Sequence, residues 1–162
     1  MHLKAMNIKG MTLIEVVLYL AIFAMFFIVM INFFFFVQDS NQLSGETLKI
    51  DRSTILITQH FEDSFKQSDS VGINTIPDID NGTLELLGDV DVTYSILDSR
   101  LQFDNSESTK PITRSDIQVT KFLLEEILDN SDTVIGVKIT VGIRSASDTT
   151  INSEFTNSYI ID

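Results

Sequence analysis

The chain has 162 residues, with 23 acidic and 11 basic side chains, a net charge of −12 and no cysteine. The absence of cysteine excludes a disulfide scaffold, thiolate metal sites and cysteine nucleophiles, and the length allows one compact domain beside an apolar segment. The acidic balance argues against direct nucleic-acid binding, which requires clustered lysine and arginine.

The first ten residues form a short basic leader. Its charged side chains are Lys4 and Lys9, and no further basic residue occurs before Lys49. Because basic residues that flank a membrane segment stay on the cytoplasmic side, we expect a cytoplasmic N-terminus and an extracytoplasmic C-terminal part.

An apolar run follows from Met11 to Val37, and Glu15 is its only charged residue. These 27 residues exceed the roughly 20 that a membrane-spanning helix needs. Three interpretations compete: a secretory signal peptide, a plain signal anchor, or a segment cleaved before the apolar run and retained. A signal peptide has a shorter apolar core and a small-residue cleavage site after it. A plain anchor leaves the costly carboxylate of Glu15 unexplained.

The stretch from Lys9 to Val16, K-G-M-T-L-I-E-V, resembles the leader and mature start of type IV pilins and type II secretion pseudopilins. In that family a membrane peptidase cleaves after the glycine and methylates the new N-terminus. The resemblance implies that Gly10 ends the leader and that Met11 becomes the methylated first residue. It also implies that Thr12 and Glu15 belong to the assembly segment.

For Glu15 the resemblance implies a pairing with the N-terminal amine of a neighbouring subunit, which would set the axial register. A carboxylate that faces an ammonium in a medium of low dielectric constant gains a strong charge-assisted hydrogen bond. The alternative is that Glu15 reaches the lipid headgroup zone and has no partner.

Two departures from the family pattern point to a minor subunit. Met11 stands where the family usually has Phe, and Asn32 stands where major pilins often have a helix-kinking Pro. The tip-capping subunit of the family characteristically lacks the glutamate. The implied partners are other pilin or pseudopilin subunits, a prepilin peptidase, an inner-membrane assembly platform and membrane lipid. The implied location is a single pass of the inner membrane, followed by a pilus or pseudopilus.

Apolar residues continue beyond the run with helical spacing, at Leu43, Ile50, Ile57, Phe61 and Phe65. This pattern predicts one helix from near Met11 to about Gln67, transmembrane over 11–37 and amphipathic over 38–67. Three further residues are expected to widen the apolar stripe: Leu48, Ile55 and Leu56. Glu46 is expected on the solvated face, and Gly45 is either a bend or a tolerated surface glycine.

Residues 68–162 predict an antiparallel β head. A loop is expected over 68–82, with a type I′ turn at Asn81-Gly82. Strands are expected over 83–87, 90–97, 100–104, 117–121, 135–143 and 155–161, and residues 122–128 fit either a strand or one helical turn. One sheet packed on the C-terminal half of the helix gives an α+β fold. Residues 112–161 also resemble minor pilins and pseudopilins of the W or J kind.

The sequence contains no catalytic or cofactor-binding motif. We expect His60 to be a surface or helix-packing histidine rather than a metal ligand. We expect Asp89 and Asp91 to be a solvent-facing pair on one strand rather than an acid–base pair. We therefore expect no enzyme activity, cofactor or metal. The predicted function is a minor pilin or pseudopilin, and the alternative is a membrane-anchored extracytoplasmic binding domain that does not polymerise.

Overall fold

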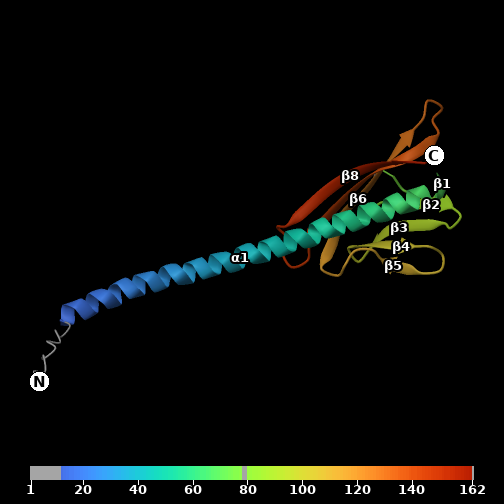
Figure 1. The fold of residues 1–162 in the computed structure, drawn as a ribbon. Coiled ribbons are helices and arrows are strands. Elements are labelled where there is room, and N and C mark those ends of the chain that lie inside the picture. The colour runs from blue at the N-terminus through green and yellow to red at the C-terminus, as the bar shows by residue number, and fades with distance from the viewer. Residues whose placement is uncertain (1–11, 78–79, 162) are drawn as a thin grey trace, which may run out of the picture. The chain divides into compact units, whose positions relative to one another are not determined.

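The structure is a computed structural model that describes residues 12–77 and 80–161 (Figure 1). The chain divides into two compact units, Met1–Leu43 and Ser44–Asp162. One helix, α1 (Leu13–Lys66), supplies the described secondary structure of the first unit and the opening segment of the second. The predicted α+β class is confirmed, because α1 packs against antiparallel sheets.

The ends of α1 follow from local chemistry. The carbonyl oxygen of Thr12 accepts the amide hydrogens of Glu15 at 3.1 Å and Val16 at 3.3 Å, so Thr12 is the N-cap residue. At the other end, the Ser68 hydroxyl donates to the carbonyl oxygen of Ser64 at 2.7 Å, which satisfies one of the last helical carbonyls. The helix continues through Gly45 without interruption.

The strands form two antiparallel sheets, whereas the sequence predicted one. The five-stranded sheet has the order β1 (Ser68–Val71), β2 (Leu84–Gly88), β3 (Val92–Leu97), β4 (Arg100–Asp104), β5 (Thr109–Pro111). The three-stranded sheet has the order β6 (Ile117–Leu128), β7 (Val134–Ser145), β8 (Asn152–Ile160). The first sheet ends at Pro111, a residue that sheets accept at their edges because it cannot donate a ladder bond.

Two further predictions for the head were wrong. The loop expected over 68–82 contains β1, and no described glycine has a positive φ, which a type I′ turn at Asn81-Gly82 would require. Gly82 instead donates its amide to the carbonyl oxygen of Phe122 at 2.8 Å, so this segment is held against β6. Positive φ values occur at Asp98 (52°) and Ser99 (59°), in the tight turn between β3 and β4, and also at Ser106 (67°) and Asp132 (58°).

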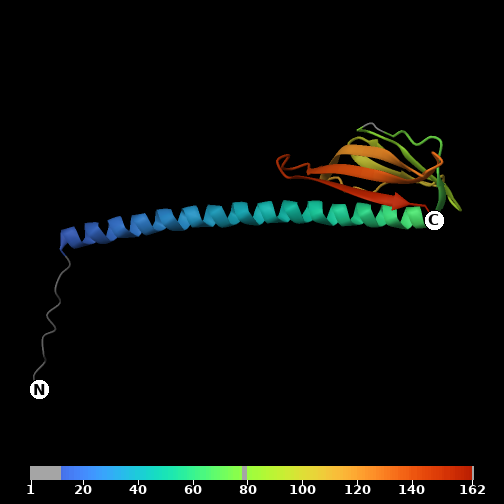
Figure 2. The same cartoon turned by 90° about the horizontal axis from the view of Figure 1, so that it is seen from above.

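The C-terminal half of α1 buries one face against both sheets, which lie on the same side of it (Figure 2). Its buried residues are Glu46, Ile50, Ser53, Ile57, Phe61 and Phe65. The predicted stripe was therefore partly wrong: Leu43, Leu48, Ile55 and Leu56 are exposed, and Glu46 is buried. The buried face of the helix is centred on Ile50, Ile57 and Phe61, and the flanking apolar residues lie outside this face.

An aromatic cluster joins α1 to both sheets. The ring of Phe61 lies 4.9 Å from Tyr94 of β3 and 6.1 Å from Phe122 of β6, measured between ring centroids. Phe65 stacks on Tyr159 of β8 at 4.8 Å. Since Phe61 contacts rings from both sheets, it is the residue through which the helix and the two sheets share one core.

The buried hydroxyl group of Tyr94 has its hydrogen-bond partners within the core. The hydroxyl of the fully buried Tyr94 lies 2.6 Å from the Ser64 hydroxyl and 2.8 Å from Nδ1 of His60. Burial raises the pKa of Tyr94, and burial lowers the pKa of the half-buried His60. His60 also packs its ring on Phe103 at 4.7 Å, so the prediction of a helix-packing histidine is confirmed.

A second polar contact ties α1 to the end of β7. One carboxylate oxygen of Glu46 accepts a hydrogen bond from the Ser145 hydroxyl at 2.7 Å, and the other accepts one from Lys49 at 2.6 Å. The bond from Lys49, followed by that from Ser145, lowers the pKa of Glu46 to about 2. The carboxylate is therefore held ionised in the folded state.

We predict that Phe61→Ala destabilises the head by about 3–5 kcal/mol, because it removes a fully buried aromatic side chain and leaves a cavity. Urea unfolding followed by circular dichroism measures this change. Leu56→Ala on the exposed face of the same helix is the matched control and should change the stability by less than about 1 kcal/mol. Equal effects of the two substitutions would contradict the described packing.

We predict that Glu46 contributes to the acid sensitivity of the head. Its pKa falls from 4.5 to about 2 on folding, so its stabilising contribution is complete above pH 4.5 and is lost as the pH falls toward 2. Glu46→Gln should lower the stability at neutral pH and flatten the stability profile across that window. Urea unfolding at a series of pH values checks this, with a substitution of the exposed Asp51, Asp51→Asn, as control. A wild-type slope retained in Glu46→Gln would show that other groups cause the acid sensitivity.

Candidate functional site

The N-terminal half of α1 is apolar on every side, and no described part of the chain covers it. All residues from 13 to 37 are exposed except the half-buried Glu15. The exposed fractions reach 86% at Leu13, 73% at Met25 and 69% at Phe36. Soluble monomers rarely expose contiguous apolar patches larger than a few hundred Å². This segment therefore requires lipid or other protein chains around it.

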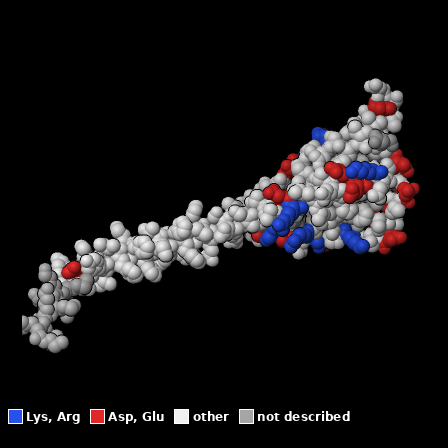
Figure 3. Space-filling view, viewed as in Figure 1, with Lys and Arg blue, Asp and Glu red and all other residues white. Residues whose placement is uncertain are grey.

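The same segment is a candidate membrane span. Residues 13–37 extend about 38 Å at about 1.5 Å per residue, which exceeds the roughly 30 Å of a bilayer's hydrocarbon core. Its hydropathy and length meet the requirements for a crossing helix, and α1 is the only helix among the described residues. Figure 3 shows this part of the chain almost free of charged side chains. The sequence-based expectation of a single candidate span at the N-terminal end is confirmed.

Glu15 lies in the first turn of α1, next to the Thr12 cap. A negative charge at this position is favourable, because the free amides of the first turn and the helix dipole are positive there. The Tyr19 hydroxyl, one turn later, donates to Oε1 of Glu15 at 3.4 Å. Among the described residues Glu15 has no cationic partner. Within the described part of the chain, the carboxylate thus has one weak hydrogen bond and no ion pair.

The structure brings together two of the predicted site residues. Thr12 and Glu15 lie in one helical turn at the start of the apolar segment. The predicted processing residues Gly10 and Met11 lie outside the described residues. The interpretation of Asp89 and Asp91 as a pair on one strand was wrong, because both lie in the connection between β2 and β3. There the carboxylate of Asp91 accepts the amide hydrogen of Gly88 at 3.4 Å, which is the role of a turn residue.

The sequence analysis missed the buried contact between Glu46 and Ser145. A signal was present, because Glu46 precedes Ile50 and Ile57 by helical spacing and so lies on the core face of α1. The partner of Glu46 could not be identified from the sequence, since Ser145 lies 99 residues away along the chain.

Comparisons of this chain with protein-family models, with curated proteins and with solved structures found no match. The fold and the exposed segment define its class directly. It is an α+β protein whose long N-terminal helix is apolar all round in its first half, where it is a candidate membrane span, and is buried along one face in its second half.

Proposed function

We propose that the chain is a minor pilin or pseudopilin, a structural subunit that is processed by a prepilin peptidase and assembled into a type IV pilus or secretion pseudopilus. The observation that carries the proposal is one acid, Glu15, in the first turn of an otherwise apolar exposed helix. The Gly10-Met11 pair lies just before it in the sequence, after a basic leader.

Cleavage after Gly10 would supply the kind of cationic group that Glu15 can pair with. It would create a new α-amino group at Met11, four residues before Glu15 and at the same end of the apolar segment. Because the acid lacks a cationic partner among the described residues, an ammonium from a neighbouring subunit would neutralise it. Such a pair in a medium of low dielectric constant is strong and directional, so it would set the axial register between subunits.

Assembly would also cover the apolar helix. In the membrane, lipid surrounds the apolar side chains and the helix satisfies its own backbone hydrogen bonds. In a filament, the same side chains would pack against the helices of neighbouring subunits. An exposed apolar surface of this extent is therefore suited both to the subunit held in the membrane and to the subunit assembled in a filament.

One contact supports a second candidate function. The hydrogen bond from Tyr19 gives Glu15 a partner within its own chain at 3.4 Å. Glu15 would then stay in the headgroup zone, and the helix would anchor a binding domain that does not polymerise. The two proposals differ in whether Glu15 acts between subunits and whether the leader is removed.

We predict that Gly10→Ala blocks processing, because the added methyl group lies at the proposed scissile bond. In cells that express the peptidase, the variant should accumulate as a precursor that migrates more slowly on a denaturing gel than the wild-type protein. Gly45→Ala is the matched control, since a Cβ there meets nothing within 4 Å. Normal processing of Gly10→Ala would contradict the proposed cleavage site.

We predict that Glu15→Ala leaves membrane insertion intact and reduces incorporation into filaments by more than about tenfold, because an unpaired buried ammonium costs about 3–5 kcal/mol. Quantitative immunoblotting of membrane and sheared-filament fractions measures both properties. Asp39→Ala removes an acid from the same helix beyond the apolar run and serves as control. Wild-type incorporation of Glu15→Ala would favour the non-polymerising anchor.

A further inference from the structure

Among the residues that the structure describes, none pairs with the outer side of the β8 backbone. Two bonds that flank the β7–β8 ladder fix its phase: Ser145 N–H to Ile151 O at 3.0 Å, and Ile161 N–H to Ile135 O at 2.9 Å. The register between β7 and β8 has no shift, so the odd-numbered residues of β8 bond to β7. The amides and carbonyls of the even-numbered residues therefore face away from the sheet. These residues are Asn152, Glu154, Thr156, Ser158 and Ile160.

The outer edges of the other three terminal strands are short, irregular or covered. β1 has four residues and a register irregularity, and β5 has three residues, the last of which is Pro111. β6 is covered in part, because its Val119 amide donates to Ser99 O at 2.7 Å and its Phe122 amide donates to Asp80 O at 2.6 Å. Proteins use such features to prevent pairing at sheet edges.

β8 has none of these features. It has nine residues, no register shift, no proline and no lysine. A strand with these properties is a template for another strand, and the contrast with the other edges indicates a surface kept open.

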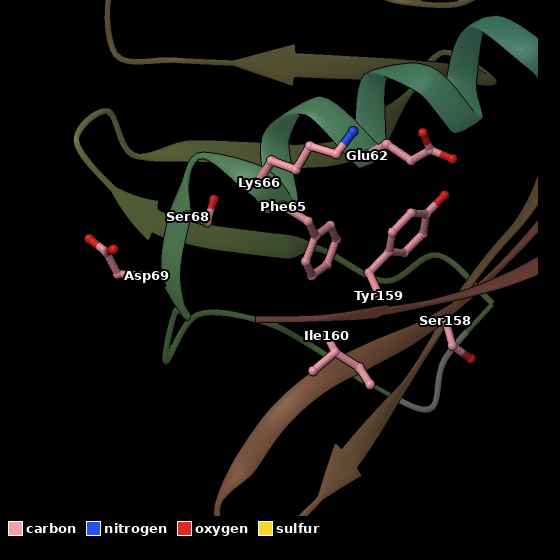
Figure 4. Close-up of a pocket in the computed structure, with 8 residues that line it drawn as sticks. All are labelled: Glu62, Phe65, Lys66, Ser68, Asp69, Ser158, Tyr159 and Ile160. Atoms are coloured by element: carbon pink, nitrogen blue, oxygen red, sulfur yellow. The ribbon is translucent and has the colours of Figure 1, made fainter. Parts of the chain in front are cut away.

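A cavity adjoins the C-terminal end of this edge. Its volume is about 370 Å³, and three elements line it: Glu62, Phe65 and Lys66 of α1, Ser68 and Asp69 of β1, and Ser158, Tyr159 and Ile160 of β8. Figure 4 shows the side chains of α1 on one wall and those of β8 on the other, with the rings of Phe65 and Tyr159 between them. The alternate side chains of a strand added to β8 would point toward α1, so this cavity has room for one of them.

We propose that the outer edge of β8 binds an extended segment of a different protein subunit, which adds a fourth strand to the three-stranded sheet and carries lysine or arginine. The basic character follows from the charges present. Glu62 and Asp69 line the cavity against the single cation Lys66, and the chain carries a net charge of −12. Glu154 on β8 is exposed but is paired with Lys121 at 3.2 Å, so the acidic character comes mainly from the cavity. A second copy would bring the same excess of carboxylates, which disfavours it as the occupant. This inference rests on the fold and is independent of the proposed function.

Amide hydrogen exchange of the full-length chain in detergent micelles, followed by NMR, tests the proposal. The probe is a nine-residue peptide that alternates lysine with valine, and the matched control alternates glutamate with valine. With the lysine peptide, exchange at Thr156 and Ser158 should slow by at least about tenfold, because these outward amides become hydrogen-bonded. The amide of Thr109, which faces the outer edge of β5, should not change, and the glutamate peptide should have little effect.

Three substitutions at Thr156 test whether the protection from exchange arises at the outer edge of β8. Thr156→Pro removes an outward N–H that makes no bond to β7, a substitution that edge strands accept, and should abolish the protection at Ser158. Thr156→Lys adds a positive charge at the edge and should weaken the effect of the lysine peptide. Thr156→Ala removes the hydroxyl that lies 2.8 Å from that of Thr140 but keeps the amide, and should retain the protection.

Three results would overturn the proposal. They are no protection by either peptide, equal protection by both, and protection that rises with protein concentration in the absence of peptide. The last result would identify a second copy of this chain as the occupant.

Discussion

The main physical constraint on this structure is an apolar helical surface that no other described part of the chain covers. From Leu13 to Val37 the helix presents apolar side chains in every direction, and no other described element packs on them. Hydrophobic burial is the dominant favourable term in folding, so a segment of this kind must obtain its burial from outside the chain. Lipid and other protein chains can supply it.

The second half of α1 obtains its burial inside the chain. Ile57 is fully buried there, and Phe61 contacts rings from both sheets, while Leu48 and Ile55 remain outside. The change comes from sequence pattern alone, because the helix is uninterrupted between the two halves. An all-apolar run needs an apolar environment all round, whereas one apolar face needs a single packed layer.

Periodicity explains what could be predicted. The 3.6-residue spacing of Ile50, Ile57 and Phe61 located the helix, and alternation located strands such as β7. These local signals did not show that the strands separate into two sheets, because that arrangement depends on contacts between residues distant in sequence. The position of β1, a four-residue polar strand, also depends on its pairing with β2 rather than on its own sequence.

The candidate site was also predictable from the sequence only in part. The sequence located Thr12 and Glu15 correctly at one end of the apolar segment, since a single acid in such a run is conspicuous. The proposed partner of Glu15 belongs to another chain, so neither the sequence nor the fold of one subunit contains it. The buried Glu46 shows the converse, because its partner Ser145 is in the same chain but becomes evident only in the folded structure.

The most direct test of this account is the mass of the N-terminal peptide of wild-type protein isolated from cells that express a prepilin peptidase. The account predicts a chain that begins at Met11 and carries a methyl group on its α-amino nitrogen. A chain that retains residues 1–10, including Lys4 and Lys9, would contradict it.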